Sequence, residues 1–415
     1  MRAEIITIGD EILIGQTVDT NSAWMAHELN LIGVDVTKIV SISDKQEEIT
    51  KALDNSVQSV DLVLITGGLG PTDDDITKKT LAEYFDTKLV LNNDVLKHIE
   101  RFVIKRKSFM NERNVKQAEV PEGCKIIQNE IGTAPGMWFE KDGKIIISMP
   151  GVPFEMKKMM EETILPELET KRTSFEIIHR TVLTQGWPES KLAEYLEEWE
   201  KNLPDVISLA YLPSPGIIKL RFTAKGENKK YLQDTINHKI QKLETIIPQL
   251  ICGYDSDKLE EITGRLLEST GKTLSVAESC TGGNIAHLIT SIPGSSSYFL
   301  GGAIAYSNDV KINLLGVSNS NIDKYGAVSK QVVEDMARGA IKRFQSDYAV
   351  ATSGVAGPTG GTAEKPVGTI WIAVCDDSKV ISQKFVFGNH RGRNIQMTSV
   401  TALNMLRKLI LEREM

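Results

Sequence analysis

DLVLITGGLGPTDDDIT, residues 61–77, is the stretch that decides the fold of this 415-residue chain. Its apolar first half is typical of a fully buried β-strand, and its adjacent glycines allow the sharp turn that follows. The aspartates after the turn suit the positive end of a helix. Strand, glycine turn and helix in this order predict βαβ units with a parallel sheet covered on both faces.

The same alternation continues on both sides of this stretch. Strands are expected at 3–9, 34–42 and 141–153, the last ending in a Pro/Gly turn, and helices at 20–33 and 153–168. These elements predict a first α/β domain over residues 1–170.

Two further domains are expected after the first. Residues 171–254 show the pattern β-α-β-β-α with no residues that suggest catalysis, which predicts a small α+β domain that connects and dimerises. From 255 to 415 strands and helices alternate again, with strands expected at 273–279, 300–307, 347–354, 367–377 and 379–388. The fold class is therefore α/β, in three domains.

Composition excludes several classes of protein. The net charge of −7 argues against a nucleic-acid partner, which needs a concentrated basic surface. No apolar run approaches the roughly 18 residues that span a membrane, and the first residues resemble a strand rather than a signal peptide, so we expect a cytoplasmic protein. The cysteines are scattered without a CxxC pair and are expected to be reduced: Cys124, Cys252, Cys280 and Cys375.

The first candidate site lies at the strand ends of the first domain. Glycines after a buried strand let backbone amides face an anion at the carboxyl edge of the sheet: Gly67, Gly68 and Gly70. Carboxylates nearby suit a divalent cation that bridges a pyrophosphate: Asp10, Glu11, Asp19, Asp73, Asp74 and Asp75. The alternative is that the three consecutive aspartates only cap the next helix.

Four motifs of this domain carry a family resemblance. GDEILIGQTVDTN (9–21), GGLGPTDDDIT (67–77), GTAPG (132–136) and MPGVPFEM (149–156) resemble the molybdopterin-binding-like domain of the CinA (competence/damage-inducible) family. The resemblance implies hydrolysis of ADP-ribose to AMP and ribose 5-phosphate with Mg²⁺, Mn²⁺ or Co²⁺. Because related domains bind molybdopterin instead, a binding module without turnover is the alternative.

The second candidate site is VAESCTGG, residues 276–283. Ser279 falls on a strand-to-helix turn, where its hydroxyl is exposed beside the amides of Thr281, Gly282 and Gly283. Free amides next to a hydroxyl are the parts of an oxyanion hole. The alternative is that Ser279 only caps the following helix.

A serine nucleophile needs a base, and lysine is the candidate. His287 lies on the same helix and His390 on a distant loop, whereas Lys311 follows a strand that is expected to end at Tyr306. A lysine has an ordinary pKa of about 10.4, so this role needs burial or nearby positive charge to lower the pKa.

The last domain carries a second resemblance to the same family. The motifs AESCTGG (277–283), AYSNDVKINLLG (305–316), SGVAGPTGG (353–361) and GNHRGRN (388–394) resemble the CinA C-terminal domain, the nicotinamide mononucleotide (NMN) deamidase also called PncC. The resemblance implies hydrolysis of NMN to nicotinate mononucleotide and ammonia without a cofactor. It also implies a homodimer.

The family pattern assigns roles to individual residues. Ser279 would be the nucleophile, Lys311 the base and Tyr306 their support, which makes Cys280 a small buried apolar group. The substrate phosphate would be held by Arg391, with Arg393 as the alternative. The family usually has Gly-Asp-Arg or Gly-Asn-Asp-Arg here, but this chain has His390 at the acidic position. Ser353 is a candidate contact to ribose or amide, or a loop cap.

Together these features predict a bifunctional enzyme that recycles pyridine nucleotides. Its partners are expected to be small nucleotides, NMN and ADP-ribose, with no nucleic acid and no membrane. The rival predictions are a regulatory binding module with only the deamidase active, and a DNA-uptake partner suggested by the family name alone.

Overall fold

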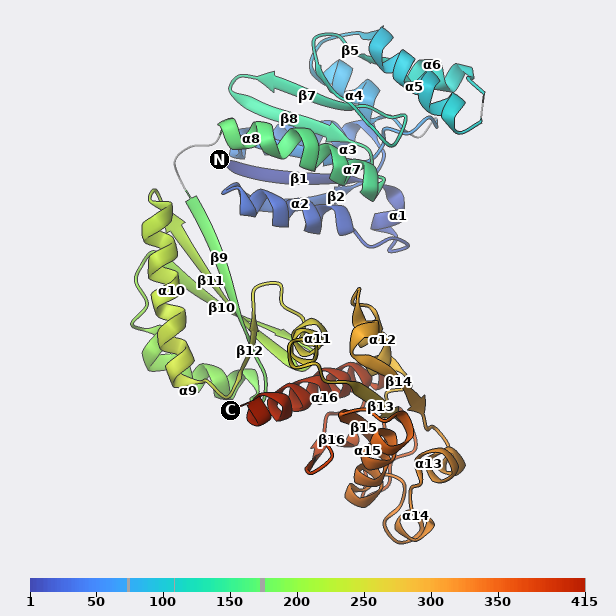
Figure 1. Cartoon of the computed structure of the whole chain (residues 1–415). Coiled ribbons are helices and arrows are strands. Elements are labelled where there is room, and N and C mark those ends of the chain that lie inside the picture. The colour runs from blue at the N-terminus through green and yellow to red at the C-terminus, as the bar shows by residue number, and fades with distance from the viewer. Residues whose placement is uncertain (73–74, 108, 172–175, 415) are drawn as a thin grey trace. The chain divides into compact units, whose positions relative to one another are not determined.

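The computed structural model describes residues 1–72, 75–107, 109–171 and 176–414 (Figure 1). The chain divides into two compact units, Met1–His179 with Thr223–Thr235, and Arg180–Phe222 with Ile236–Met415. The described residues form sheets of six, four and five strands and one two-stranded ribbon. No described helix is both long and apolar enough to span a membrane.

The six-stranded sheet has the strand order β2-β1-β3-β8-β7-β6. Its members are β1 (Arg2–Ile8), β2 (Asp35–Ile42), β3 (Leu62–Thr66), β6 (Lys125–Ile127), β7 (Gly136–Lys141) and β8 (Lys144–Met149). Strands β2, β1, β3 and β8 are parallel, and β7 is antiparallel to both of its neighbours, β8 and β6. The predicted parallel sheet comprises four of the six strands, and β7 departs from it, because Asp142 and Gly143, both with positive φ, close a tight hairpin between β7 and β8.

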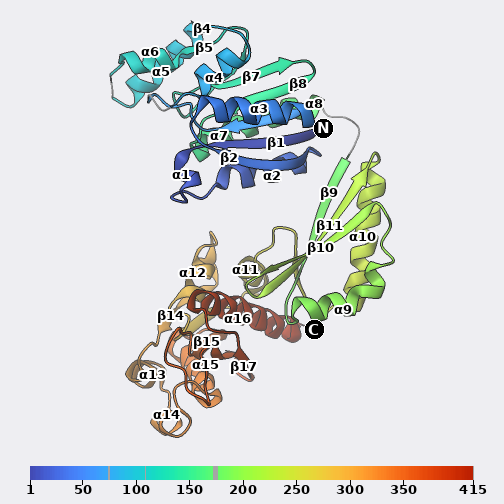
Figure 2. The same ribbon diagram turned by 180° about the vertical axis from the view of Figure 1, so that it is seen from behind.

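Helices cover both faces of this sheet (Figures 1 and 2). Ile5 of β1 packs in one core cluster and Ile6 in the other, since successive strand residues point to opposite faces. The first cluster contains residues of α2 (Thr20–Leu31) and α7 (Pro153–Met159), and the second contains residues of α3 (Gln46–Ser59) and α4 (Thr77–Tyr84). This is the predicted three-layer α/β arrangement.

The remaining elements of this region are short. The helix predicted at 153–168 consists of α7, a π-helical turn, η1 (Met160–Ile164), and α8 (Leu165–Lys171). The others are α1 (Asp10–Leu13), α5 (Asn93–Lys105), α6 (Glu112–Gln117) and the ribbon of β4 (Leu89–Leu91) with β5 (Glu119–Pro121).

The four-stranded sheet has the order β10-β11-β9-β12. Its strands are β9 (Glu176–Thr184), β10 (Ile207–Ser214), β11 (Ile217–Gly226) and β12 (Ile251–Tyr254), and its helices are α9 (Glu189–Glu200) and α10 (Lys229–Ile246). The predicted β-α-β-β-α pattern lacks β12, which pairs antiparallel with β9. A four-residue strand is too short to show an alternating pattern.

The five-stranded sheet has the order β14-β13-β15-β16-β17. Its strands are β13 (Leu274–Glu278), β14 (Phe299–Ile304), β15 (Tyr348–Gly354), β16 (Thr369–Cys375) and β17 (Val380–Val386). The first three strands in this order are parallel, and β16 is antiparallel to both of its neighbours, β15 and β17. Val276 and Ala277 belong to different core clusters, so both faces of the sheet are covered.

The helices of this domain lie on two sides. Residues of α11 (Leu259–Thr270), α12 (Asn284–Thr290) and α16 (Arg391–Glu414) pack on the face of Val276. Residues of α13 (Asn308–Leu315), α14 (Asn319–Tyr325) and α15 (Lys330–Phe344) pack on the face of Ala277, and η2 (Ser295–Ser297) is a single 3₁₀ turn.

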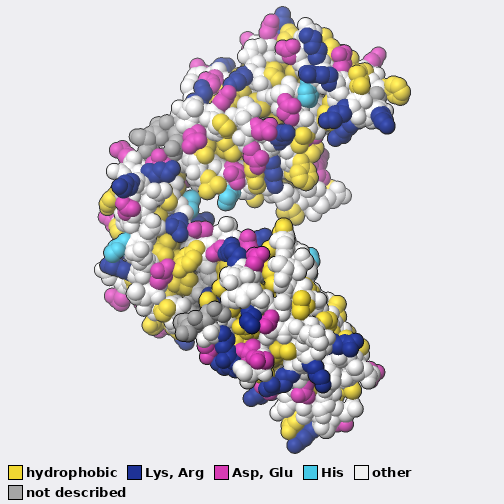
Figure 3. Space-filling view, viewed as in Figure 1, with side chains coloured by type: hydrophobic (Ala, Val, Ile, Leu, Met, Phe, Trp, Pro, Cys, Tyr) yellow, Lys and Arg dark blue, Asp and Glu magenta, His cyan; other side chains and the backbone are white. Residues whose placement is uncertain are grey.

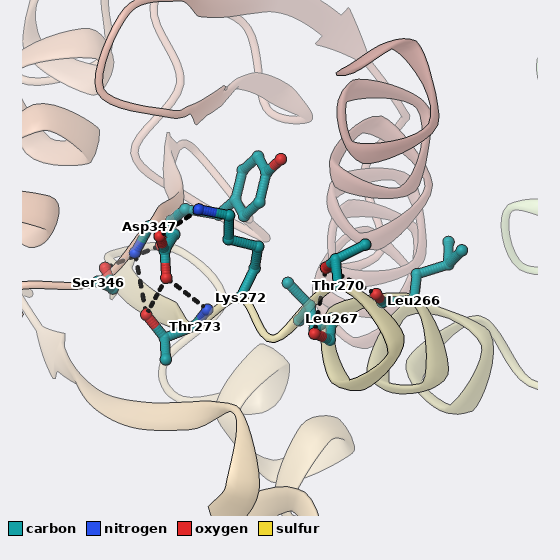
Figure 4. A network of polar contacts seen from close by, with 8 residues as sticks. Leu266, Leu267, Thr270, Lys272, Thr273, Ser346 and Asp347 are labelled. Atoms are coloured by element: carbon teal, nitrogen blue, oxygen red, sulfur yellow. Dashed lines mark hydrogen bonds and ion pairs between the residues drawn. The ribbon is translucent and has the colours of Figure 1, made fainter. Parts of the chain in front are cut away.

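A polar network fixes the amino ends of β13 and β15 (Figure 4). Asp347 accepts hydrogen bonds from the Thr273 amide at 2.8 Å, the Thr273 hydroxyl at 2.7 Å and Lys272 Nζ at 2.9 Å. Burial opposes ionisation of Asp347, but these hydrogen bonds outweigh it and lower the pKa of the carboxyl. The two strands are thus aligned at the edge opposite to their glycine-rich carboxyl ends.

Candidate active site and phosphate-binding loops

Ser279 follows β13 at the carboxyl edge of the five-stranded sheet. Its amide donates to the Thr352 carbonyl of β15 at 3.0 Å, so the chain is still held to the neighbouring strand one residue beyond β13. The turn into α12 begins here, as predicted. Ser279 is only 9% exposed, so the expectation of an exposed hydroxyl at this turn is wrong: the residue is largely buried.

Lys311 reaches Ser279 from the first turns of α13. The Ser307 hydroxyl caps this helix by accepting from the Val310 amide at 3.3 Å. Lys311 Nζ lies 3.2 Å from Ser279 Oγ and donates to the Ala305 carbonyl at 2.8 Å. The structure therefore brings together two residues that are 32 positions apart in the sequence.

The surroundings of Lys311 favour its neutral form. Only 2% of the residue is exposed, and no carboxylate among the described residues forms an ion pair with it. Burial lowers the pKa of Lys311. A buried neutral amine next to a hydroxyl can accept the hydroxyl proton, which is the chemistry of a general base.

Tyr306 contributes differently from the prediction. Strand β14 ends at Ile304, two residues earlier than expected, and Tyr306 is 62% exposed. Its carbonyl lies 3.4 Å from Lys311 Nζ, whereas its phenol accepts from Arg391 Nη2 at 3.0 Å. Tyr306 thus contacts the Ser–Lys pair through its backbone and Arg391 through its side chain.

The predicted set of free glycine amides is wrong. The Gly282 amide donates to the Ser279 carbonyl at 3.2 Å, and the Gly283 amide donates to Glu278 Oε2 at 3.0 Å. The Thr281 hydroxyl shares a hydrogen bond of 2.7 Å with the Thr352 hydroxyl. Within the described part of the chain, the Thr281 amide has no recorded acceptor, so it is the amide of the predicted set that is left to stabilise an oxyanion.

Glu278 is a site residue that the sequence analysis missed. It is fully buried and accepts from three amides at the start of α12, those of Gly283, Ile285 and Ala286, at 3.0, 3.1 and 2.8 Å. Its charge faces the positive end of the helix. The signal in the sequence was an acidic residue directly before a helix that opens with glycines.

The neighbouring thiol is unsuited to attack. Cys280 is buried, and burial raises its pKa to about 12, because the thiolate would lose its hydration. The thiolate is the nucleophilic form, so Cys280 has the properties of the small apolar group that was predicted.

Arg391 is the first residue of α16 rather than part of a loop. Its guanidinium donates to the Gly357 carbonyl at 2.9 Å and to the Tyr306 phenol at 3.0 Å. Neither partner is an anion, so both contacts orient the guanidinium without neutralising it. The side chain of Arg393 is exposed two residues further on.

Ser353 has a structural contact. Its hydroxyl donates to the Ala327 carbonyl at 2.7 Å, and the residue is almost completely buried. The structure does not bring Ser353 into hydrogen-bond contact with Ser279 or Lys311; its observed partner is the loop before α15.

The loop after β3 requires glycine at three positions, Gly67, Gly68 and Gly70. Gly67 and Gly68 have positive φ, and an added Cβ would approach the Ile8 carbonyl or the Thr77 hydroxyl to 2.1 Å. At Gly70, a Cβ would lie 2.5 Å from the Asp75 carboxylate. The loop lies at the carboxyl edge of the sheet, as predicted, but the Gly67 amide donates to the Met149 carbonyl at 3.1 Å and is not free to face an anion.

The described carboxylates near this loop have different partners. Asp19 caps α2, because it accepts from the Ser22 amide at 2.9 Å and from the hydroxyls of Thr7 and Ser22 at 2.7 and 2.6 Å. Asp75 accepts from the Thr72 amide at 2.9 Å and precedes α4 by two residues, and the N-cap position of α4 is Ile76, so Asp75 is not the helix cap that the alternative interpretation expected.

The other predicted carboxylates lie at the start of α1 or outside the described residues. Asp10 and Glu11 occupy the first turn of α1, and the Asp10 amide donates to Asp44 Oδ2 at 3.1 Å. Asp44, which the sequence analysis missed, also lies 3.4 Å from the Cβ position of Gly68. Asp73 and Asp74 lie outside the described residues. In the described ranges no three His, Cys, Asp or Glu side chains converge as metal ligands, so these carboxylates alone do not form a metal site.

Asn21 connects two of the first-domain motifs. Its Nδ2 donates to the Gly151 carbonyl at 2.7 Å and to the Thr66 hydroxyl at 3.3 Å. Its Oδ1 is buried and has no hydrogen-bond partner in the described structure. An unused acceptor at this strand edge marks a place where a ligand could donate a hydrogen bond.

These features define a class: a multidomain α/β protein with glycine-rich loops at the carboxyl edges of two sheets, one of them carrying a buried Ser–Lys pair. Three family models match the chain: "Probable molybdopterin binding domain" over residues 4–170, "Damage-inducible protein CinA KH domain" over 179–253 and "CinA C-terminal domain" over 256–410.

Relatives match along almost the whole chain. A CinA-like protein of Cytophaga hutchinsonii is 47% identical over 99% of this chain and 98% of its own length. A CinA-like protein of Flavobacterium psychrophilum is 47% identical over 99% of both. A crystal structure of the competence/damage inducible protein CihA from Agrobacterium tumefaciens is 40% identical, covers 36% of this chain and 94% of that one, and has a TM-score of 0.35. The chain belongs to the CinA family.

Proposed function

We propose that the last domain hydrolyses the amide of NMN to nicotinate mononucleotide and ammonia. The observation that supports this proposal is the buried Lys311 amine, whose pKa is lowered and which lies 3.2 Å from Ser279 Oγ. A hydroxyl paired with a neutral amine is a nucleophile with its general base.

In the proposed reaction Lys311 takes the Ser279 proton while Oγ bonds to the amide carbon. The carbonyl oxygen becomes an oxyanion, which the Thr281 amide, with no recorded acceptor in the described structure, would stabilise. Lys311 then returns the proton to the departing nitrogen, the C–N bond breaks and ammonia leaves an acyl ester on Ser279. Water, deprotonated by Lys311, attacks the ester and releases the carboxylic acid and the serine. No cofactor takes part in these steps.

The contacts of Tyr306 explain how one nucleotide would be held at both ends. Its backbone touches Lys311 and its phenol touches Arg391, so a single residue spans from the reacting pair to an unneutralised guanidinium. An amide at the pair and a phosphate at Arg391 match the two ends of NMN.

We further propose that the first domain hydrolyses ADP-ribose to AMP and ribose 5-phosphate with Mg²⁺, Mn²⁺ or Co²⁺. The proposal is supported by the tight loop at Gly67 and Gly68, the nearby carboxylate of Asp44 and the unused acceptor of Asn21. Because the described carboxylates form no metal cluster, the proposal requires ligands from Asp73 and Asp74.

Both proposed substrates, NMN and ADP-ribose, are breakdown products of NAD. A homodimer and a cytoplasmic location remain predictions from the resemblance and the composition.

One experiment tests both activities. Purified full-length protein is incubated separately with NMN and with ADP-ribose, the latter with and without each metal, and products are identified by mass. Nicotinate mononucleotide and ammonia would support the first proposal, and unchanged NMN would overturn it. Unchanged ADP-ribose with every metal would make the first domain a binding module.

A nucleic-acid partner needs a separate measurement. The face shown in Figure 3 intermingles acidic and basic side chains, which does not favour a phosphate backbone. DNA binding that weakens steeply with added salt would contradict the proposal that small nucleotides are the partners.

A further inference from the structure

His390 caps the helix that carries Arg391. The ring nitrogen Nδ1 accepts from the Arg393 amide at 3.1 Å, and the His390 carbonyl accepts from the Asn394 amide at 2.9 Å. A side chain that accepts from the amide three residues later is the geometry of an N-cap. The Arg393 amide can only donate, so Nδ1 must accept. An imidazole accepts at Nδ1 when the ring is neutral and its proton is on Nε2.

The same turn is attached to the glycine-rich loop after β15. Asn394 Nδ2 donates to the Ala356 and Gly388 carbonyls at 3.0 and 2.9 Å, and Arg391 donates to the Gly357 carbonyl. The first turn of α16 is therefore fixed from both sides, by the His390 cap before it and by the loop beside it.

His390 stands where the resemblance implies an acidic residue, and its ring takes over the capping role of that carboxylate. A carboxylate next to Arg391 would cap the helix but also offset the positive charge of the guanidinium. An uncharged ring supplies the cap alone, and the contacts of Arg391 are a carbonyl and a phenol. The guanidinium is thus oriented while its charge stays available for an anion.

We infer that His390 is a positioning residue for recognition of the substrate phosphate. By capping α16 it holds Arg391 in its first turn, where the guanidinium donates to the phenol of Tyr306, the residue whose carbonyl lies 3.4 Å from Lys311 Nζ. This inference rests on the proposed deamidation of NMN. The effect should appear in binding of the phosphate end and not in the chemistry at Ser279, since His390 has no recorded contact with Ser279 or Lys311 in the described structure.

The test compares full-length wild type with His390→Ala, which removes the cap, and with His390→Asn, which keeps an uncharged acceptor. With NMN, we expect His390→Ala to raise KM about threefold to tenfold with kcat within about twofold. His390→Asn should stay near wild type. With nicotinamide riboside, which lacks the phosphate, all three proteins should behave alike.

Three results would overturn the inference: an unchanged KM for NMN in His390→Ala, an equal loss with the riboside, or no rescue by His390→Asn. Thermal unfolding midpoints show whether any variant is generally unstable. If wild type does not deamidate NMN, the proposed function fails by itself. Calorimetric titration of NMN into the three proteins then still tests His390, because equal affinities would overturn its role.

Discussion

The glycine-rich loops after β3 and after β13 look alike in sequence but differ in what their polar groups do. After β13, a buried lysine and a hydroxyl meet at 3.2 Å. After β3, Asp75 accepts from the Thr72 amide, and Asp19, which follows β1 at the same end of the sheet, caps α2. The loop after β13 thus holds one member of a reactive pair. The described residues of the loop after β3 include no group of side chains that converge as metal ligands.

This difference shows that a strand-glycine-helix turn provides a location and not a chemistry. In the last domain the chemistry comes from α13, which delivers Lys311 to the turn from another part of the chain. In the first domain the comparable contribution would have to come from Asp73 and Asp74. Substitutions in each loop can therefore test whether the two loops also differ in activity.

The largest effect is expected at Ser279. Ser279→Ala removes the attacking oxygen and should lower the rate of NMN deamidation by a factor on the order of 10⁴ or more, measured as ammonia release. Cys280→Ala is the matched control and should keep most activity, because the thiol has a pKa of about 12 and stays protonated. An inactive Cys280→Ala with an active Ser279→Ala would exchange the roles of the two residues.

Lys311 should show the next largest effect. Lys311→Arg puts a permanently charged guanidinium with a pKa above 12 at this position, which cannot accept a proton, so we expect a loss of about 10³-fold. In wild type, activity should rise with pH as Lys311 loses its proton, and burial should place this rise below the ordinary lysine range near about 10.4. A pH profile of kcat/KM without such a rise would contradict a lysine base.

The first-domain loop is tested by removing single charges. Asp74→Asn and Asp75→Asn should each lower metal-dependent ADP-ribose hydrolysis by about 10-fold to 100-fold at limiting metal. NMN deamidation by the same proteins is the internal control and should not change. Wild-type ADP-ribose rates in both variants would show that these aspartates only support the loop.

Sequence patterns predicted the parts of the fold that long, regular segments determine. The buried strands β1, β3, β13 and β15 and the helices between them have clear periodicity, so their order and the position of Ser279 after β13 are as expected. The strands β4, β5, β6 and β12 have three or four residues and were not predicted, because such segments contain too few residues for a period, and the six-residue strand β7 was missed as well.

The contacts inside the sites were less predictable. Lys311 was predictable, because a serine nucleophile requires a base. The hydrogen bond from the Gly283 amide to Glu278 was not, because it depends on how β13 and α12 meet in space. Asp44 reaches the Gly68 loop from a distant segment in the same way. Hydrogen bonds between side chains and backbone far apart in sequence leave no periodic signal, so only the structure reveals them.

The smallest effect is expected at the opposite edge of the last sheet, where Asp347 aligns β13 and β15 (Figure 4). A carboxyl whose pKa is lowered by folding adds stability above its unfolded pKa of about 3.9, and this stability is lost as pH falls through the folded pKa. Asp347→Asn should therefore lower stability by about 1 kcal/mol at pH 7, a value reduced by the partial exposure of the group. The difference from wild type in the thermal midpoint should shrink below about pH 4.

Lys272→Met is the control, because it leaves the Thr273 hydrogen bonds to Asp347 intact, and it should change the thermal midpoint less than Asp347→Asn. Because this network lies away from Ser279, a loss of NMN deamidation in folded Asp347→Asn would show that the two edges of the sheet are not independent.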